Sequence, residues 1–339
     1  MAIGIELRPG GVLPNLSRRT SCVRRARGPL AMVAATASWG VGTAVNKLTL
    51  ERVQLRPMTQ QAIELSASVG VLAALVGVRR RVRRCAQAPT DMTRASRRGW
   101  PGLLEPGASY VLGLLGLSMT AATHAAVIGA LEPTFVALGS WLVFRRRMRA
   151  GDAALMSLAL AGALLVILST SGVGSGASDG GDALLVVSVA CAAGYVMLSE
   201  RGVGRVPPLV ATLTQQVWAM LVVVPVLAAS IGTVGLGPMP AGRAWLLVMA
   251  AGILSYLVPF ALYLTALESL PATMAAQYLA LIPLCGLAGA ALLLGERLTV
   301  AALAGAAVVV VALFLLSRAT DDAQYTIDTR PQSSDARRP

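Results

Sequence analysis

Residues 117–142 of the chain read LSMTAATHAAVIGALEPTFVALGSWL, and residues 267–292 read LESLPATMAAQYLALIPLCGLAGAAL. The two stretches align without a gap at a shift of 150 residues. Matching Ala and Leu residues are weak support, because apolar helices share them by chance. The matching Thr, Pro and Gly residues are stronger: Thr123/Thr273, Pro133/Pro283 and Gly139/Gly289. A second, shorter match aligns Thr59-Gln60-Gln61 with Thr214-Gln215-Gln216 at a shift of 155 residues. The sequence therefore predicts an internal repeat.

The composition places this repeat in a membrane. Hydrophobic residues make up 55% of the 339 residues, charged residues only 13%, and the mean hydropathy is +0.68. Soluble domains carry about 25% charged residues. So little charge cannot cover the surface of a water-soluble protein of this size, which excludes a cytoplasmic enzyme and a disordered chain. The net charge of +13 indicates nucleic-acid binding only if it forms a basic face on a folded domain. Here the arginines lie between long apolar runs, so we expect no nucleic-acid partner.

The apolar runs predict ten membrane spans, since a bilayer core needs roughly 20 apolar residues per helix. The expected spans are 30–50, 57–78, 101–121, 124–144, 151–170, 183–199, 209–231, 243–265, 271–294 and 299–317. The expected fold is thus an all-α polytopic membrane protein with little room for a soluble domain. Each half, 30–170 and 183–317, holds five spans, and a Gly/Ser/Asp linker at 171–182 joins them on the outside.

An odd number of spans per half inverts the second half relative to the first. Inverted repeats around a site near the bilayer midplane are the architecture of many secondary transporters. Two nearly equivalent packings can then exchange and open that site to alternate sides. This repeat is the strongest indication of function in the sequence, and it predicts transport by alternating access through a central cavity.

The positions of the arginines predict the orientation. Six lie in the tail at 1–29, eight in the loop at 79–98, four at 145–149, two at 201–205 and four in the tail at 318–339. Four others fall on the opposite side: Arg52, Arg56, Arg243 and Arg297. Both termini are therefore expected in the cytoplasm. The bias toward Arg and Ala is typical of GC-rich bacterial coding, so we expect a multi-pass protein of the bacterial cytoplasmic membrane.

The chain resembles the EamA family of the drug/metabolite transporter superfamily over residues 30–317. Trp39-Gly40, Asn46-Lys47, Leu131-Glu132-Pro133-Thr134-Phe135 and Leu292-Leu293-Leu294-Gly295-Glu296-Arg297-Leu298 carry the resemblance. It implies a ten-helix bundle of two inverted repeats that moves small organic solutes, often outward. The first half departs from the pattern, because Arg145-Arg146-Arg147-Met148 stands where the second half has Gly-Glu-Arg-Leu. Gln60 and Gln61 also stand near a position where relatives often carry an arginine.

Ionisable residues at membrane depth are expensive and need a partner or a role. Glu132 is predicted to contact a substrate amine or carry a coupling proton; alternatively it stabilises the bend at Pro133 with a hydroxyl or Lys47. Glu64 shares a helical face with Gln60 and lies on the cavity wall or at the outer mouth. Lys47 either extends outward to the headgroups or balances Glu132 or Glu64. Glu64 and Lys47 join Glu132 as candidate residues for ion coupling.

Weaker expectations concern other polar residues near helix ends. Glu105, beside Pro106, is expected at the cytoplasmic mouth or in the turn that leads into its span. His124 is expected to be an interfacial polar residue, and Glu268 and Glu296 to make capping or gate contacts at helix ends.

A polar and aromatic cavity lining is predicted, with ordinary helix packing or an interfacial belt as the alternative for each aromatic residue. Its candidates, besides Glu132, are Gln277, Tyr278, Trp39, Gln60, Gln61, Tyr110, Tyr195 and Tyr256. The predicted hinges are Pro133, Pro225, Pro259 and Pro283, since proline bends a helix.

We expect no cofactor and no metal. Cys22, Cys85, Cys191 and Cys285 lack the spacing of a zinc site or disulfide framework.

The leading hypothesis is a secondary transporter that exports a small organic metabolite or drug, with protons as a candidate coupling ion. No nucleotide-binding GxxxxGK[ST] motif is present to indicate an ATP-driven pump. The alternatives are an integral membrane enzyme acting on lipids or isoprenoids, and a membrane sensor that transports nothing. The enzyme would need clustered carboxylates or His/Asp groupings, whereas these carboxylates are isolated.

Overall fold

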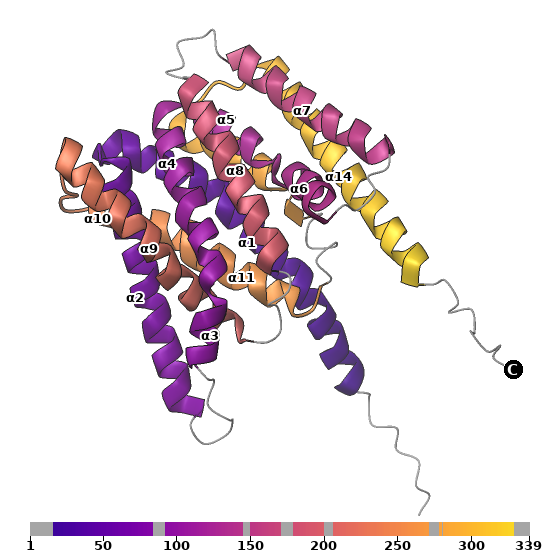
Figure 1. The fold of residues 1–339 in the computed structure, drawn as a ribbon, viewed down its shortest axis with the longest axis horizontal. Helices are drawn as coiled ribbons and strands as arrows, with labels where there is room; N and C mark the ends of the chain where they lie inside the picture. Colours follow the sequence, from indigo (N-terminus) through magenta and orange to yellow (C-terminus); the bar gives the residue numbers. More distant parts are fainter. Residues whose placement is uncertain are drawn as a thin grey trace, which may run out of the picture.

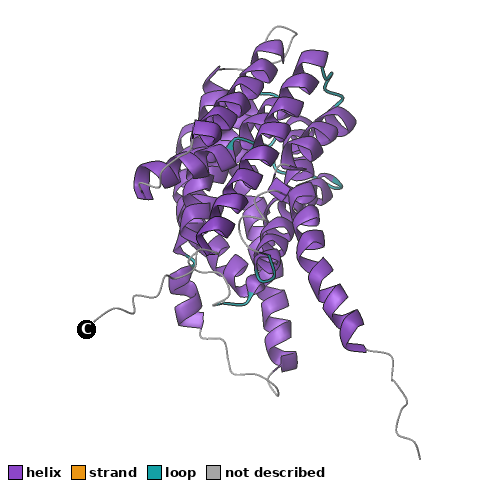
Figure 2. Cartoon of the chain, turned by 90° about the vertical axis from the view of Figure 1, so that its right-hand side faces the viewer, coloured by secondary structure: helices purple, strands orange, loops and turns teal. Residues whose placement is uncertain are grey.

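The computed structural model describes residues 16–83, 92–144, 150–170, 179–199, 206–270, 278–279 and 281–328. Across these residues the regular structure is helical throughout, and the helices pack into one elongated bundle (Figures 1 and 2). Apolar side chains are exposed along the outside of many helices, as in Leu221 and Leu246. A surface of this kind suits lipid rather than water, in keeping with the composition.

The first repeat consists of long helices on either side of a broken middle. Its elements are α1 (Leu16–Val53), α2 (Pro57–Arg83), α3 (Met92–Arg98), η1 (Trp100–Leu103), η2 (Leu104–Ala108), α4 (Ser109–Met119), α5 (Ala122–Gly129), α6 (Glu132–Phe144) and α7 (Ala150–Thr170). Helix α1 starts well before the expected span at 30–50. The segment 79–98, expected to be a loop, is helical in the last part of α2 and in α3.

The second repeat follows the same plan. Its elements are α8 (Asp179–Ser199), α9 (Pro208–Val234), α10 (Ala244–Gly252), η4 (Ile253–Leu257), α11 (Val258–Leu267), α13 (Leu281–Gly289), η5 (Ala290–Leu294) and α14 (Val300–Asp328). Helix α8 takes in the last residues of the predicted linker. Helix α14 continues past the expected end of the last span.

Helices are interrupted at corresponding places in the two repeats. The third expected span contains the π-helical turn η2, and the eighth contains the π-helical turn η4, displaced by about 150 residues. Such turns widen the helix locally and are frequent at functional sites. The fourth span breaks at the turn Ala130–Leu131, between α5 and α6. Irregular backbone of this kind is tolerated at membrane depth only where protein or a water-filled cavity surrounds it.

The repeats pack against each other through a matched pair of glycines. A Cβ atom added to Gly102 would lie 2.0 Å from the carbonyl oxygen of Gln215 in α9. A Cβ atom on Gly252 would lie 2.8 Å from the carbonyl oxygen of Glu64 in α2. The two glycines are 150 residues apart, so each repeat places its broken helix on the second long helix of the other. Small residues permit this close approach.

Helices α7 and α14, the last of each repeat, lie side by side along one edge of the bundle (Figure 1). Ala159 of α7 and Ala302, Ala306 and Val309 of α14 belong to one buried cluster. This pair closes the bundle on the side away from α2 and α10. It therefore leaves the broken helices of both repeats in the centre.

Helical segments cover each of the ten expected spans within the described residues, but a count of ten membrane crossings stays a prediction. Five helical stretches are long and apolar enough to cross a bilayer: Pro57–Val82, Ala122–Gly139, Asp179–Leu198, Pro208–Val234 and Ala244–Leu267. Shorter apolar segments accompany them at Ala153–Gly162 within α7, at Leu281–Leu294 across α13 and η5, and at Val300–Ala312 within α14.

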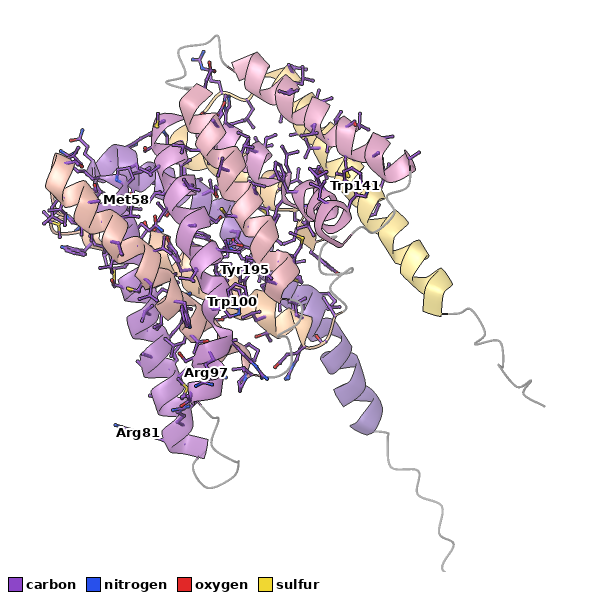
Figure 3. All side chains as sticks on the ribbon, viewed as in Figure 1. Met58, Arg81, Arg97, Trp100, Trp141 and Tyr195 are labelled. Carbon is purple, nitrogen blue, oxygen red and sulfur yellow. The ribbon has the colours of Figure 1, made fainter. Side chains whose placement is uncertain are left out.

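Basic side chains gather at one end of the bundle. Arg81 on α2 and Arg97 on α3 lie together at that end (Figure 3). The first turns of α1 and the last turns of α14 also point that way (Figure 1). The predicted orientation requires this arrangement, with the arginine-rich end in the cytoplasm.

Candidate functional site

A cavity of about 190 Å³ lies among the broken helices of both repeats. Position-equivalent residues from the two repeats form part of its lining: Glu105 and Ser255, Gly113 and Tyr263, Gly129 and Leu279, and Glu132 and Ile282. In each of these pairs the numbers differ by 150. The cavity thus lies on the pseudo-symmetry axis of the fold, where inverted-repeat transporters hold their substrates.

Two carboxylates from the first repeat line this cavity. Glu105 lies within η2 in a non-helical backbone conformation, and its exposed fraction is 8%. Glu132 is the first residue of α6, beyond the turn that ends α5. The two side chains are close enough to interact electrostatically. Among the described lining residues there is no Lys, Arg or His to balance them.

Aromatic rings form one wall of the cavity. The Trp39 Nε1 group donates a hydrogen bond to the Tyr110 hydroxyl at 2.9 Å, and that hydroxyl donates to the Ser255 carbonyl oxygen at 2.8 Å. Tyr110 lies against Tyr256 with ring centroids 4.6 Å apart, and Trp39 meets Phe260 edge-on at 5.4 Å. This chain of contacts joins α1, α4, η4 and α11, so the wall is built by both repeats.

Hydroxyl groups line the remaining wall. Tyr195, near the centre of the bundle in Figure 3, donates its hydroxyl to Gln215 Oε1 at 3.1 Å. Ser188 of α8 donates to the Ser109 carbonyl oxygen at 2.7 Å. The Ser255 Oγ atom is buried without a hydrogen-bond partner. A buried hydroxyl in this state is available to a bound solute or water, because leaving it unpaired costs free energy.

Three predicted candidates on α2 lie beside the cavity rather than on it. Gln60, Gln61 and Glu64 are fully buried and do not belong to the lining. The Gln60 Nε2 group donates to Glu64 Oε1 at 2.7 Å, so the predicted i, i+4 pairing of these residues is present. The Gln61 amide, oriented so that both of its ends have partners, contacts the Tyr110 carbonyl oxygen and the Val111 amide. These glutamines hold helices together behind the wall.

Lys47 lies near the C-terminal end of α1, and its contacts do not include the lining carboxylates. Its Nζ atom donates to the carbonyl oxygens of Leu117 at 3.1 Å and Thr120 at 2.8 Å, and lies 3.7 Å from a Glu51 carboxylate oxygen. Two of these contacts satisfy the last carbonyl groups of α4, which the helix itself leaves unpaired. The hydrogen bonds and ion pair of Lys47 thus involve neither Glu132 nor Glu64.

A group of polar contacts joins the end of α4 and the start of α5, at the end of the bundle that the predicted topology assigns to the outside. Asp182 of α8 accepts from the Thr120 hydroxyl at 2.8 Å and lies 3.0 Å from His124 Nδ1. Glu296 of the second repeat accepts from the backbone amides of Ala122 at 2.9 Å and Thr123 at 3.0 Å, and from the Thr123 hydroxyl. The expected helix-end role of Glu296 is confirmed. We call Lys47, Thr120, His124, Asp182 and Glu296 the outer seal.

Glu296 caps a helix of the opposite repeat. Its carboxylate binds the first amides of α5, which have no partners inside the helix, and negative charge is favourable at a helix N-terminus. The corresponding place in the first repeat, Arg145-Arg146-Arg147-Met148, lies outside the described residues. The Gly-Glu-Arg-Leu string of the second repeat therefore holds the outer end of α5 in place.

The remaining candidates fall at several distances from the cavity. Tyr278 packs beside Met32 and Tyr263 rather than on the lining, and Gln277 lies outside the described residues. Pro133 follows the break between α5 and α6, and Pro259 follows η4. Pro283 is near the start of α13, whereas Pro225 lies within the continuous helix α9. Whether these prolines act as hinges stays a prediction.

The sequence prediction did not include several lining residues among its candidates. For Glu105 the sequence left two alternatives, the cytoplasmic mouth or the turn that leads into its span, and the structure places it on the cavity lining. Ser255 and Tyr263 went unnoticed. The repeat could have identified them, because Ser255 aligns with Glu105 at the shift of 150 residues. Short polar residues in an apolar span gave no signal of their own.

The chemistry of this cavity suits a small solute with positive charge. Carboxylates supply charge-assisted hydrogen bonds, and the faces of Trp and Tyr rings attract cations. The volume is below the 300–1,000 Å³ that is typical of sites for drug-sized ligands. No group of three or more His, Cys, Asp or Glu side chains that could hold a metal ion occurs among the described residues.

Comparisons with known proteins agree with this architecture. Residues 26–168 and 179–318 each match the model of the EamA-like transporter family. A solved structure described as "Crystal structure of protein" shares the fold, with a TM-score of 0.58 and 18% sequence identity. The match covers 88% of this chain and 99% of the other. No curated protein matches the sequence.

Proposed function

Because the chain belongs to the EamA-like transporter family, and is therefore a multi-pass membrane transporter of the drug/metabolite type, we propose that it is a secondary exporter of small organic cations. The solute binds in the central cavity, and the two repeats rock to expose it to alternate sides of the cytoplasmic membrane. The termini face the cytoplasm in this proposal, and the outer seal opens during each cycle.

The observation that carries the proposal is the pair of carboxylates on a cavity shared by both repeats. Glu105 and Glu132 face the same small volume, with no basic side chain among the described lining residues. Each carboxylate at membrane depth costs about 2.5–3.5 kcal/mol on insertion scales. A bound cation offsets that cost and removes the repulsion between the two groups. An amine or guanidinium group on the solute supplies both effects.

The aromatic wall supports an organic rather than an inorganic cation. Trp39, Tyr110, Tyr195 and Tyr256 offer apolar faces as well as hydroxyl or ring N–H groups. Such rings contact the carbon skeleton of a solute while the carboxylates hold its charged end. The cavity volume of about 190 Å³ suits a metabolite smaller than a typical drug.

Two features support the outward direction of transport that we propose: the family resemblance and the charge of the cavity. The arginine-rich ends of α2 and α3 belong to the predicted cytoplasmic side, and the outer seal closes the opposite side. A cavity closed on the outside and bearing negative charge can collect a cationic metabolite from within the cell. Opening of the seal would then release it outward.

The test is metabolite profiling of medium and cytosol from cells with matched membrane levels of each variant. The cells carry the wild-type protein, Glu132→Gln or an empty vector. We expect a class of amines or guanidines to accumulate outside only with the wild type. In Glu132→Gln their export falls at least about tenfold, since a hydrogen bond to a charged group is worth about 1.5–3 kcal/mol.

The control is Glu51→Gln, which removes an exposed carboxylate from α1. We expect it to export as the wild type does. Identical profiles in wild-type and empty-vector cells that are supplied with a panel of amines would contradict export. Export of neutral or acidic solutes alone would contradict the cationic substrate. A Glu132→Gln profile equal to the wild type would remove Glu132 from the mechanism.

A further inference from the structure

Beside the cavity lies a second group of buried oxygen atoms, formed by Asn46 of α1 with Gln60 and Glu64 of α2. We call these three residues the amide–carboxylate cluster. The Gln60 Nε2 group bridges it, since it donates to the Asn46 carbonyl oxygen at 3.2 Å and to Glu64 Oε1 at 2.7 Å. The side chains are at least nine-tenths buried, with Asn46 exposed by 8% and the other two by 0%.

The cluster has too many acceptors for its donors. Three of its side-chain oxygens are buried without a hydrogen-bond partner: Asn46 Oδ1, Gln60 Oε1 and Glu64 Oε2. Buried polar atoms are almost always paired, because an unpaired one costs about 1–3 kcal/mol. Three such atoms within a single group of contacting residues would be satisfied by an electropositive partner.

Glu64 has no cationic side chain as its partner among the described residues. Lys47, next to Asn46 in the sequence, is bound to the ends of α4 and to Glu51. From η4 the titratable group facing Glu64 is Tyr256, and α10 presents the backbone of Gly252. A carboxylate in this position needs a proton or a metal cation, since an uncompensated charge would be costly.

We propose that the amide–carboxylate cluster binds the small inorganic cation, H⁺ or Na⁺, whose gradient drives export. Hard cations such as these favour oxygen donors, and the three free oxygens supply a carboxylate and two amide carbonyls. Sodium would contact the three oxygens, whereas a proton on Glu64 would be donated to one of the amides. The inference rests on the proposed export function and adds a coupling site that lies behind the solute cavity and shares Asn46 with its lining.

The position of the cluster explains how the bound cation can influence the cavity. Asn46 also lines the cavity, so α1 connects the two sites directly. Gly252 packs on the backbone of Glu64 and immediately precedes η4, which carries the lining residues Ser255 and Tyr256. Loss of the cation would leave a charged group in this tight interface. The charge favours separation of α2 from η4, which would move the aromatic wall.

Comparison with the second repeat indicates that packing alone does not require a carboxylate at position 64. At the shift of 155 that relates Gln60 to Gln215, Glu64 corresponds to Ala219, which is also fully buried. The same place in the fold is therefore filled by a small apolar side chain. A carboxylate that is present in only one of two equivalent interfaces serves a role other than shape.

The first experiment measures the thermal stability of the purified full-length protein in detergent. NaCl is exchanged for choline chloride at constant ionic strength, and the series is repeated at several pH values without Na⁺. We expect the wild-type Tm to rise by several degrees with the bound cation, since ligands of the folded state stabilise it. Glu64→Gln should lose that response, and the matched control Glu51→Gln should keep it.

The two series distinguish the cations. A response to Na⁺ at fixed pH that disappears in Glu64→Gln assigns sodium. A stability difference between wild type and Glu64→Gln that changes with pH but not with Na⁺ assigns the proton. If both proteins respond alike in both series, the site is disproved. Should Glu64→Gln fail to fold, Asn46→Ala and Gln60→Ala test the same site, because each removes one amide oxygen.

For sodium, each amide variant should need at least about tenfold more Na⁺ for the same stabilisation, the equivalent of one lost contact of about 1.4 kcal/mol. For the proton, each should shift the pH at which stability changes. Wild-type behaviour in both amide variants would overturn the proposal. These measurements vary only Na⁺ and pH, so they can confirm the cation site even if metabolite profiling finds no exported solute.

Discussion

The two repeats supply four pairs of equivalent positions to the cavity, and the side chains at these positions differ strongly in chemistry. Glu105 and Glu132 line the cavity from the first repeat, and the equivalent positions of the second repeat hold Ser255 and Ile282. Beside the cavity, Glu64 has Ala219 as its counterpart. Among the described residues, the carboxylates on the cavity and directly behind it thus belong to one repeat. In the proposed exporter, the inverted repeat separates two tasks, since symmetry would give two exchangeable packings while sequence differences would provide the recognition.

The largest expected effect concerns the symmetric part of the fold. Gly102→Ala should prevent stable folding, because the new Cβ atom would lie 2.0 Å from a backbone oxygen of Gln215. Its partner Gly252→Ala should be milder, since the closest approach there is 2.8 Å. Overpacking of this kind costs about 1–3 kcal/mol or more. The measurement is the monodisperse fraction and Tm of the purified variants.

The control for both glycines is Gly70→Ala on α2, where a Cβ atom has no neighbour within 4 Å. This variant should be as stable as the wild type or gain up to about 1 kcal/mol, because alanine favours a helix more than glycine does. Equal stability of Gly102→Ala and Gly70→Ala would mean that the two repeats do not meet as closely as described.

A second prediction moves a carboxylate from one repeat to the other. Glu105→Ser should lower export at least about tenfold through loss of a charge-assisted contact worth about 1.5–3 kcal/mol. Adding Ser255→Glu to that variant should restore part of the activity, because the equivalent position faces the same cavity. Export of an amine from cells is the measurement. If the double variant is no better than Glu105→Ser, the two positions are not interchangeable for the solute.

A smaller effect is expected in the aromatic wall that joins the repeats. Tyr110→Phe leaves Trp39 Nε1 without its acceptor and frees the Ser255 carbonyl oxygen. These are two neutral hydrogen bonds within the wall, and a loss of about 1 kcal/mol in solute binding through the loosened wall should weaken it roughly fivefold. The apparent affinity for the exported amine measures it. Phe260, which contacts Tyr110 and bears no hydroxyl, offers the control Phe260→Leu.

For this pair, we expect Phe260→Leu to weaken binding less than Tyr110→Phe does. The opposite order would show that ring packing, and not the hydrogen-bonded chain, determines the affinity.

The smallest effect is expected at the outer seal. Glu296→Gln removes the negative charge that the second repeat places on the first amides of α5, worth about 0.3–1 kcal/mol. The outer end should therefore open more often, by roughly twofold to fivefold. The rate at which a cysteine at Ala121, beside the capped amides, reacts with an impermeant thiol reagent measures this. An unchanged rate would assign the closed state to contacts other than Glu296.

Much of the fold was predictable because it rests on local signals. The apolar runs, the arginine bias and the gapless repeat gave the helices and the two halves, and the family match agrees with both. The candidate site was less predictable. Five of its predicted residues line the cavity: Trp39, Tyr110, Glu132, Tyr195 and Tyr256. They could be chosen from the sequence because large polar residues are unusual in apolar helices.

Other candidates lie off the cavity lining, and some lining residues were missed, for physical reasons. Gln61 looked like a lining residue, but it binds the backbone of the neighbouring helix. Lys47 was considered as a counter-charge, yet its length allows it to reach the end of α4. Ser255 was missed, because a single serine in a span has no distinctive pattern. Such partners depend on which faces meet, and periodicity alone does not identify the neighbour of a helix face.

The sequence alone determined that this is a helical membrane protein with two related halves, because hydropathy and repetition are properties of the chain. Only the tertiary structure decided where its charges lie. Glu132 and Glu105 face the cavity, Glu64 is buried behind it with free oxygens around it, and Glu296 caps a helix of the opposite repeat. All are carboxylates in apolar surroundings along the chain. Their different environments arise from contacts between residues far apart in sequence.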